Sequence, residues 1–260
     1  MGAGMLGGIL GSLLLVLVGI TVNTSTSSLL LLSSMVLMMI RPRFICFSYA
    51  GGALSLMHIL FGVPQIDVPQ VMGLVAVLHW VEAVLIRIAG FRGAKACMLP
   101  VGNGYWQQGH YLNRIWPLPL VALMAYFAVP ENLTHAFQEM PQWWPLIPAN
   151  EQLLSQQSPG LSGAGGELCY SLVPVTAVLG YNDETIGQTP RERAKKTANQ
   201  LMVYSLLLLF LCWVAGKWAS FAVVPALFGP LVHDYLICQG VSSVRHRCAK
   251  IAQRGQTWKN

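Results

Sequence analysis

Charge is the first property that this sequence lacks. Only 10% of its 260 residues are Asp, Glu, Lys or Arg, whereas 54% are hydrophobic. An ordinary soluble domain carries about 25% charged residues, so this chain has too few to cover a surface that faces water. Its apolar runs reach or approach the roughly 20 residues that cross a bilayer core. The composition therefore excludes a typical soluble domain and predicts a polytopic membrane protein.

Motifs of metal and protease chemistry are also missing. The six cysteines form no C-x-x-C pair, so we interpret them as small apolar residues without a disulfide role. No H-E-x-x-H motif is present, which excludes an intramembrane zinc protease of that type. The N-terminal run has no basic segment before its apolar stretch. It therefore predicts a first span rather than a cleaved signal peptide.

The apolar runs between helix breakers predict how many spans there are. The second, fifth and sixth runs are short or interrupted by proline, so we expect about eight spans, with six as the lower bound. We therefore expect an all-α polytopic transmembrane bundle with a small cytoplasmic hairpin at Asn103-Gly104, a pair that favours a tight turn. The runs lie near 4–22, 25–40, 44–63, 70–88, 115–130, 168–181, 198–216 and 219–238.

Basic residues orient these predicted spans. With the N-terminus in the cytoplasm, segments 41–43, 87–114 and 182–197 are cytoplasmic and 131–167 is the long outer loop. All of the 16 Lys and Arg residues except Lys217 then lie inside, as the positive-inside rule requires. Anionic lipid headgroups are the expected contact of these residues, rather than nucleic acid. The membrane-orienting residues are Arg41, Arg43, Arg87, Arg92, Lys95, Arg114, Arg191, Arg193, Lys195, Lys196, Arg245 and Arg247.

The chain is thus expected to consist of a multi-span membrane domain, residues 1–240, and a basic cytoplasmic tail, residues 241–260. At the foot of the seventh predicted span, Thr189-Pro190 followed by Glu192 matches the start of a capped helix. Thr189 is the expected N-cap residue. The polar stretch before this span therefore predicts an anchored helix rather than a binding loop.

Five ionisable side chains interrupt the predicted spans, and one of them, His58, lies in the outer half of the third span. His79 and Glu82 lie three residues apart on one helical face, and His233 and Asp234 lie in the last span. Such groups are costly in a bilayer and need a partner or a wet cavity. Two interpretations stay open, a polar clasp that fixes how spans pack, which we favour, and a metal or proton site. No catalytic residue, metal ligand or cofactor is assigned.

Four stretches carry a family resemblance: "IRPRFICFSYAGGALSL", "VMGLVAVLHWVEAVLI", "VPVTAVLGYND" and "PALFGPLVHDYLI". The chain resembles the membrane portion of the PDZ-domain-containing multi-pass proteins of Firmicutes, which include MinJ-like cell-division topology proteins. The resemblance implies a bacterial cytoplasmic membrane, both termini in the cytoplasm and an adaptor role. The 23 residues after Ile237 are too few for the PDZ domain that captures extended peptides in that family.

The expected function is a non-enzymatic membrane scaffold or anchor, associated with cell division or the envelope. Its expected partners are lipid and other membrane or division proteins. The alternative is a small transporter, or an ion-, proton- or metal-binding membrane protein, that uses the cluster His79, Glu82, His233 and Asp234. Segments broken by Gly and Pro are typical of transporters, but the two halves of this sequence show no repeat.

Overall fold

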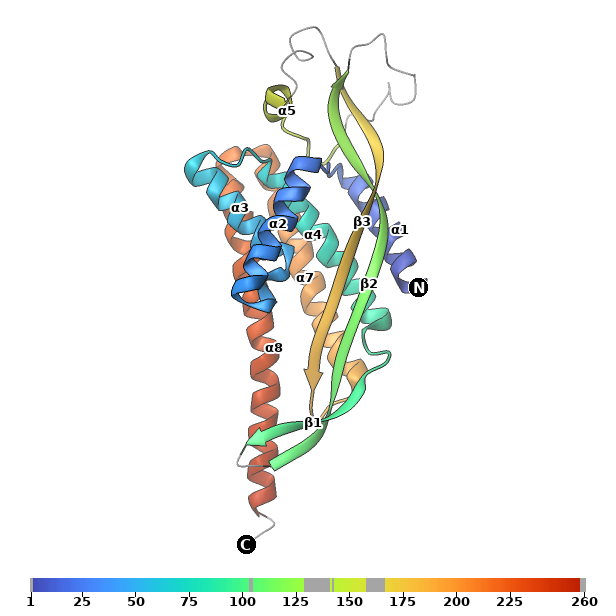
Figure 1. The fold of residues 1–260 in the computed structure, drawn as a ribbon, viewed down its shortest axis with the longest axis vertical. Helices are drawn as coiled ribbons and strands as arrows, with labels where there is room; N and C mark the ends of the chain where they lie inside the picture. The colour runs from blue at the N-terminus through green and yellow to red at the C-terminus, as the bar shows by residue number, and fades with distance from the viewer. Residues whose placement is uncertain (1, 103–104, 129–140, 142, 158–166, 258–260) are drawn as a thin grey trace.

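A computed structural model of the chain describes residues 2–102, 105–128, 141, 143–157 and 167–257. The first half contains α1 (Gly2–Val18), α2 (Thr24–Ile40), η1 (Pro42–Ile45), α3 (Phe47–Phe61), α4 (Val68–Leu85), η2 (Ile86–Gly90), β1 (Lys95–Gly102) and β2 (Tyr105–Ala128). The second half contains α5 (Glu151–Gln157), β3 (Glu167–Thr185), α7 (Pro190–Lys217), η4 (Ala219–Ala222) and α8 (Val223–Thr257). Figure 1 shows a long ribbon of β2 and β3 beside a helical bundle, beyond which α8 extends.

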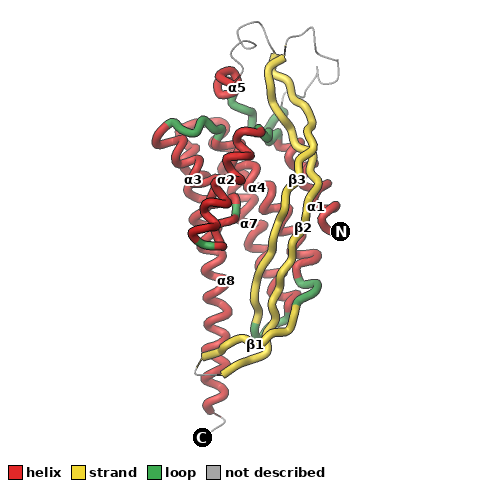
Figure 2. The backbone as a smooth tube through the Cα atoms, viewed as in Figure 1, coloured by secondary structure: helices red, strands yellow, loops and turns green. Residues whose placement is uncertain are grey.

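A three-stranded antiparallel sheet, in the order β1-β2-β3, overturns the predicted all-α fold. Segments 115–130 and 168–181 were predicted as the fifth and sixth spans. Residues 115–128 of the first belong to β2, and the second belongs to β3 (Figure 2). Pro117 and Pro119 disfavour a helix because proline lacks an N–H and clashes with the preceding turn. The run "VPVTAVLGY" is rich in β-branched residues, which fit a strand. Apolar length alone therefore predicted the wrong element.

The predicted count of about eight spans, with six as its lower bound, is also wrong. Among the described residues, three helices are long and apolar enough to cross a membrane: Val68–Gly90, Pro190–Lys217 and Ala219–Val244. The first three apolar runs do form helices, but these have only 17, 17 and 15 residues. Gly19 and Gly62 have positive φ, at 81° and 73°, and end α1 and α3 early because this backbone conformation breaks a helix.

Helix α4 is the centre of the bundle. It packs against α1, α3, α7 and α8, and 67% of its apolar window is buried, compared with 39% in α7 and 28% in α8. Its start is capped by Asp67, whose side chain accepts a hydrogen bond from the Gln70 N–H. Polar side chains on α4 therefore face protein, whereas α7 and α8 leave most of their apolar surface uncovered.

Strand β1 pairs with the start of β2 on either side of Asn103-Gly104, with Lys95 opposite Tyr111. The turn itself lies outside the described residues. Instead of forming a separate hairpin, these strands continue into the longer β2–β3 ladder, which runs from His110 opposite Thr185 to Ala128 opposite Glu167. The predicted helix start is confirmed, because Thr189 and Glu192 form a reciprocal capping box at the start of α7. Most of the predicted outer loop 131–167 lies outside the described residues.

Helix α1 covers the edge of β2 that faces away from β3. The Val121 N–H donates a hydrogen bond to Ser12 Oγ at 2.8 Å, and the Leu123 carbonyl accepts one from the Val22 N–H. Pro117 and Pro119 share this edge with Val121 by strand alternation. Because proline carries no N–H, these two positions present only carbonyls to α1.

Two glycines let α1 approach those carbonyls. A Cβ atom at Gly4 would lie 2.4 Å from the Pro117 carbonyl oxygen, and one at Gly8 would lie 2.2 Å from the Pro119 oxygen. Both distances are shorter than any real contact of a Cβ atom. The Gly4-x-x-x-Gly8 spacing therefore works as small-residue packing does between membrane helices, here between a helix and a strand edge.

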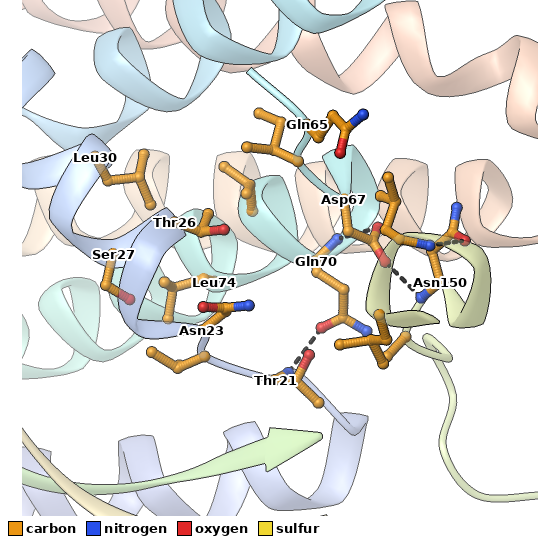
Figure 3. Close-up of a pocket in the computed structure, with 16 residues that line it drawn as sticks. Thr21, Asn23, Thr26, Ser27, Leu30, Gln65, Asp67, Gln70, Leu74 and Asn150 are labelled. Carbon is orange, nitrogen blue, oxygen red and sulfur yellow. Dashed lines mark hydrogen bonds between the residues drawn. The ribbon is translucent and has the colours of Figure 1, made fainter. Parts of the chain in front are cut away.

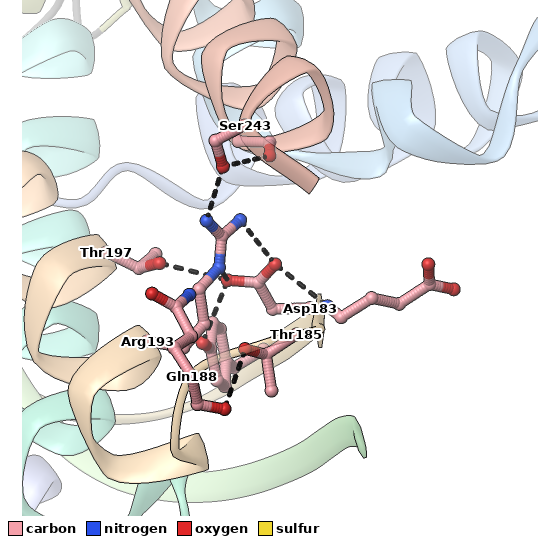
Figure 4. A network of polar contacts seen from close by, with 9 residues as sticks. Asp183, Thr185, Gln188, Arg193, Thr197 and Ser243 are labelled. Atoms are coloured by element: carbon pink, nitrogen blue, oxygen red, sulfur yellow. Dashed lines mark hydrogen bonds and ion pairs between the residues drawn. The ribbon is translucent and has the colours of Figure 1, made fainter. Parts of the chain in front are cut away.

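The end of the molecule that carries β1 is joined to α8 through a buried ion pair. Arg193 contacts both carboxylate oxygens of Asp183, at 2.8 and 2.7 Å, and donates a hydrogen bond to Ser243 Oγ at 2.9 Å (Figure 4). Thr197 Oγ1 donates to the same carboxylate. We call this end the distal module, which comprises β1, residues 105–111 and 183–189, and α8 from Gly240 to Cys248.

Substitution of Gly8 tests the packing of α1 on β2. Gly8→Ala is expected to lower the free energy of unfolding by about 1–3 kcal/mol, as overpacking does, because its Cβ would meet the Pro119 carbonyl. Gly2→Ala is the matched control, since no atom lies within 4 Å of a Cβ at that position. Thermal unfolding of the detergent-solubilised protein, followed by Trp fluorescence, measures both. Equal midpoints for the two variants would contradict this packing.

Candidate metal centre

Three side chains from three different helices meet inside the bundle. Cys46 Sγ lies 3.1 Å from His79 Nε2 and 3.6 Å from His233 Nε2. All three donor atoms lie within 4.8 Å of one another, and among the described residues this is the group of His, Cys, Asp and Glu whose geometry suits a metal ion. Cys46 precedes α3, His79 belongs to α4 and His233 to α8. We call these three residues the Cys–His cluster.

His79 is held in the orientation of a ligand. It is 3% exposed, and its Nδ1 lies 2.7 Å from the Val75 carbonyl oxygen one turn earlier on α4. A carbonyl accepts but cannot donate, so Nδ1 carries the proton and Nε2 is left with a free lone pair that faces Cys46. Ligating histidines in proteins are oriented by such a hydrogen bond on their other nitrogen.

Cys46 is the N-cap residue of α3. Its sulfur accepts a hydrogen bond from the Ser48 N–H at 3.5 Å. The first turn of a helix presents unpaired N–H groups and a partial positive charge. This position therefore balances the negative charge that a metal-bound thiolate carries.

His233 has bonding capacity that the chain does not use. Its Nδ1 is buried and has no hydrogen-bond partner within the described part of the chain. A buried polar atom without a partner costs free energy, but this nitrogen is not the one that faces Cys46, so it carries no part of the argument for an ion. The Cys46 sulfur is the polar atom that lies near the other nitrogen of this ring.

Aromatic rings enclose the cluster. The Tyr204 ring centroid lies 5.5 Å from that of His79 and 5.8 Å from that of His233. The Tyr204 hydroxyl donates to the Gly229 carbonyl at 3.0 Å and lies 2.8 Å from Ser48 Oγ. Because its hydroxyl is already engaged in these hydrogen bonds, Tyr204 acts as a wall of the cluster rather than as a fourth donor.

Asp234 is adjacent to His233 in sequence but serves another purpose. Its Oδ1 accepts a hydrogen bond from the Tyr49 hydroxyl at 2.9 Å and lies 3.4 Å from an Arg43 guanidinium nitrogen. Arg43 lies in η1 and Tyr49 in the first turn of α3. The carboxylate therefore ties the turn that carries Cys46 to the helix that carries His233, and it positions two of the three donors.

The donor spacing fits a transition metal. With metal–sulfur bonds of about 2.3 Å and metal–nitrogen bonds of about 2.0–2.1 Å, sulfur and nitrogen ligands of one ion lie about 3.5–3.8 Å apart. The observed separations from Cys46 Sγ, 3.1 and 3.6 Å, need only small side-chain movements to match. Thiolate and imidazole are ligands for zinc and copper, whereas magnesium, calcium and manganese prefer oxygen.

The structure brings together half of the predicted polar cluster. His79 and His233 meet, with ring centroids 5.1 Å apart, whereas Asp234 turns to Arg43 and Tyr49. Glu82 is half-buried one helical turn after His79 and is not one of the three donors. Sequence analysis missed Cys46, because it lies 33 residues from His79 and 187 from His233 and no motif spacing links the three.

The predicted membrane-orienting residues have mixed surroundings. Arg43 and Arg193 pair with carboxylates, Arg87 donates to Asn199 Oδ1, Arg114 donates to the Arg92 carbonyl, and Arg247 donates to the Gly187 carbonyl. Arg191 lies over the Phe91 ring. Arg41, Arg92, Lys95, Lys195 and Lys196 are exposed, and the side chain of Arg245 lies outside the described residues. Pairing within the chain thus accounts for several charges that were assigned to lipid.

A small cavity lies between the start of α2, the start of α4 and the start of α5 (Figure 3). Its volume of about 50 Å³ holds only a few water molecules. Gln70 lines the cavity. Its side chain accepts a hydrogen bond from the Thr21 N–H at 2.7 Å and donates one to the Ile147 carbonyl at 2.8 Å. Asp67 Oδ2 accepts a hydrogen bond from the Asn150 N–H at 2.8 Å. These contacts join three segments of the chain, so the cavity is a structural junction.

Comparisons of the chain with protein-family models, with curated proteins and with solved structures found no match. The resemblance to MinJ-like proteins was not tested by them and stays a prediction.

Asp67 gives the junction a pH dependence. Burial raises the pKa of its carboxyl from 3.8 to about 6, against the opposing effect of the Asn150 and Gln70 N–H groups. The folded state therefore holds the proton more tightly, and the free energy of unfolding falls as the pH rises between these two values. Asp67→Asn is expected to remove this fall, whereas Glu151→Gln, an exposed carboxyl at the same end, keeps it. Thermal midpoints from pH 4 to 7.5 measure it, and parallel curves for wild type and Asp67→Asn would refute it.

Proposed function

We propose that this chain is an integral membrane protein that binds one transition-metal ion in the membrane interior. The observation that carries the proposal is the convergence of Cys46 Sγ, His79 Nε2 and His233 Nε2. Three candidate spans, α4 with η2, α7 and the first part of α8, support the membrane location. Exposed apolar side chains on α1, among them Met5, Ile9, Leu13 and Leu17, support it as well, because they repeat at helical spacing on one face.

The depth of the cluster supports an intramembrane site. His79 lies twelve residues after Asp67, which is about 18 Å along α4 at 1.5 Å per residue. A bilayer core is about 30 Å thick. With α4 as a span, the Cys–His cluster therefore lies near the middle of the bilayer rather than at a headgroup layer.

Helices α2 and α3 support the same proposal. They have 17 and 15 residues, or about 26 and 22 Å, and lie side by side with η1 at their turn (Figure 1). Neither is long enough to cross the core, so we place them as a helical hairpin that enters and leaves on the same side. At about 22–26 Å in a core of about 30 Å, its tip lies in the far half of the core. It carries Cys46, Arg43, which pairs with Asp234, and the exposed Arg41, whose long side chain can extend to the far headgroups. Discontinuous helices whose ends meet an ion near the midplane are typical of membrane transporters.

The metal content of the purified protein tests this function. Wild type is expected to retain about one equivalent of a transition metal through dialysis against a weak chelator. Cys46→Ser and His79→Gln are each expected to lower retention at least about tenfold, since each removes one of three ligands. His58→Gln is the control, because His58 bonds the Pro64 carbonyl at the other end of α3. Plasma mass spectrometry gives the metal content, and thermal melting shows that each variant folds.

A simple polar clasp gives a different result in the same experiment. It predicts no retained metal in wild type, while Cys46→Ser and His79→Gln lose only thermal stability. That outcome would refute the metal proposal.

A scaffold or anchor role, as expected from the sequence, is the second candidate, and the distal module favours it. Leu99 of β1 packs with Val244 and Cys248 of α8 and with Ile186, so the end of the sheet and the extension of α8 form one folded body. This body projects beyond the helical bundle (Figure 1). This projection supports a role in contacting division or envelope proteins at the membrane surface.

Cross-linking in cells tests the second candidate. A photo-reactive residue at Met98, which is exposed on β1, is expected to form an adduct with a partner protein, whereas one at Met39 on α2 reaches only lipid. Arg193→Met should abolish the Met98 adduct, because it leaves Asp183 buried and unpaired at a cost of about 3–5 kcal/mol. Lys195→Met, an exposed neighbour, should keep it. A Met98 adduct that survives Arg193→Met, or the lack of any adduct, would contradict the scaffold role.

A further inference from the structure

The Cys–His cluster has a feature that distinguishes between transition metals, and this inference rests on the proposed function. Its donors are one sulfur and two imidazole nitrogens. Carboxylates lie nearby on the same helices, at Glu82 and Asp234, but neither belongs to the group. The set is therefore soft and carries one negative charge, that of the Cys46 thiolate. Soft sulfur ligands favour Cu(I) and zinc over the harder divalent ions.

The number of donors separates these two metals. A zinc site is almost always four-coordinate, with a water molecule in the fourth position where the protein supplies three ligands. Here Tyr204 is held by Ser48 and Gly229, and its ring walls the cluster beside the two histidines. Three protein donors, with no fourth His, Cys, Asp or Glu among the described residues, suit the three-coordinate geometry that Cu(I) readily accepts.

Charge leads to the same metal. Cu(I) bound to a thiolate and two neutral imidazoles gives a centre of zero net charge, whereas Zn²⁺ leaves one positive charge. An uncompensated charge is costly in an apolar interior. The Asp234 carboxylate does not neutralise the positive charge of a zinc centre, because its Oδ1 is already paired with Arg43 and accepts a hydrogen bond from Tyr49. The same pairing also keeps the Asp234 charge balanced when the ion is absent.

The metal-free arrangement fits this assignment. The Cys46 thiol can donate its proton toward His79 Nε2, 3.1 Å away. When the ion binds, this proton is released to solvent and the sulfur and both imidazoles bind the metal, with no change of oxidation state. His79 keeps its hydrogen bond to the Val75 carbonyl throughout, so the site needs little rearrangement.

We infer that the Cys–His cluster is a three-coordinate site for monovalent copper. It is selected over zinc by its single thiolate, by its two imidazoles, and by the neutral centre that they form with Cu(I), and the described residues supply no fourth donor. Entry of the ion is expected from the side of η1. Cys46 is half-buried, whereas His79 is buried, and the Arg43–Asp234 pair beside it is about one-third exposed.

A competition experiment tests the inference. The full chain in detergent, kept anaerobic with a reductant, is titrated with Cu(I) supplied as its bicinchoninate complex, with and without Zn²⁺. One Cu(I) per chain is expected, and it should resist a hundredfold excess of Zn²⁺. X-ray absorption at the copper edge should show one sulfur and two nitrogen ligands.

Matched cysteine variants locate the site. Cys46→Ser is expected to weaken Cu(I) binding at least a hundredfold, because it replaces the soft ligand. Cys238→Ser is the control, since this exposed cysteine lies in α8, the helix that carries His233, but is not one of the three donors. It should change the affinity less than about twofold. Equal effects of the two variants would overturn the assignment of copper to the Cys–His cluster.

The possible failures are distinguishable. If wild type retains zinc and Zn²⁺ displaces Cu(I), the copper inference fails while the metal-binding function stands. If neither ion binds to wild type that unfolds cooperatively on heating, both fail. If Cu(I) binds with four ligands, the selection by coordination number is wrong.

Discussion

Polar groups enclosed by apolar surroundings must find their partners within the chain, and most of this structure follows from that requirement. The free edge of β2 meets it through Ser12, which accepts the Val121 N–H, and through two prolines that have no N–H to satisfy. At one end of the bundle, Gln70 satisfies the Thr21 N–H and the Ile147 carbonyl with hydrogen bonds. At the other end, the buried charge of Arg193 is paired with Asp183. Each of these contacts joins segments that are distant in sequence.

The Cys–His cluster satisfies the same requirement only in part. His79 and Cys46 have partners, whereas Nδ1 of His233 has none among the described residues. A polar clasp and an ion site share this geometry, because three donors that hold helices together through weak contacts can also surround an ion. The difference lies in the thiol, which is a modest hydrogen-bonding group but a strong metal ligand. This feature favours an ion over a clasp.

The short helices α2 and α3 account for part of the error in span count and also for the candidate site. Helices α2 and α3 stop short of a full crossing, at Ile40 and Phe61, and the turn between them places the start of α3 against α8. The ends of short helices thus put polar backbone and a thiol in the interior, where the carboxylate of Asp234 holds the turn in place.

The sequence by itself determined the apolar class of the chain, the helices at most of the long apolar runs, the capping box at Thr189 and the presence of His79 and His233 within helices. These follow from local composition and spacing. Only the tertiary structure decided that β2 and β3 are strands, since an apolar run suits a buried strand as well as a helix. It also decided that Cys46 joins the two histidines while Glu82 does not. No local pattern encodes that meeting, because it depends on where three helices end and pack.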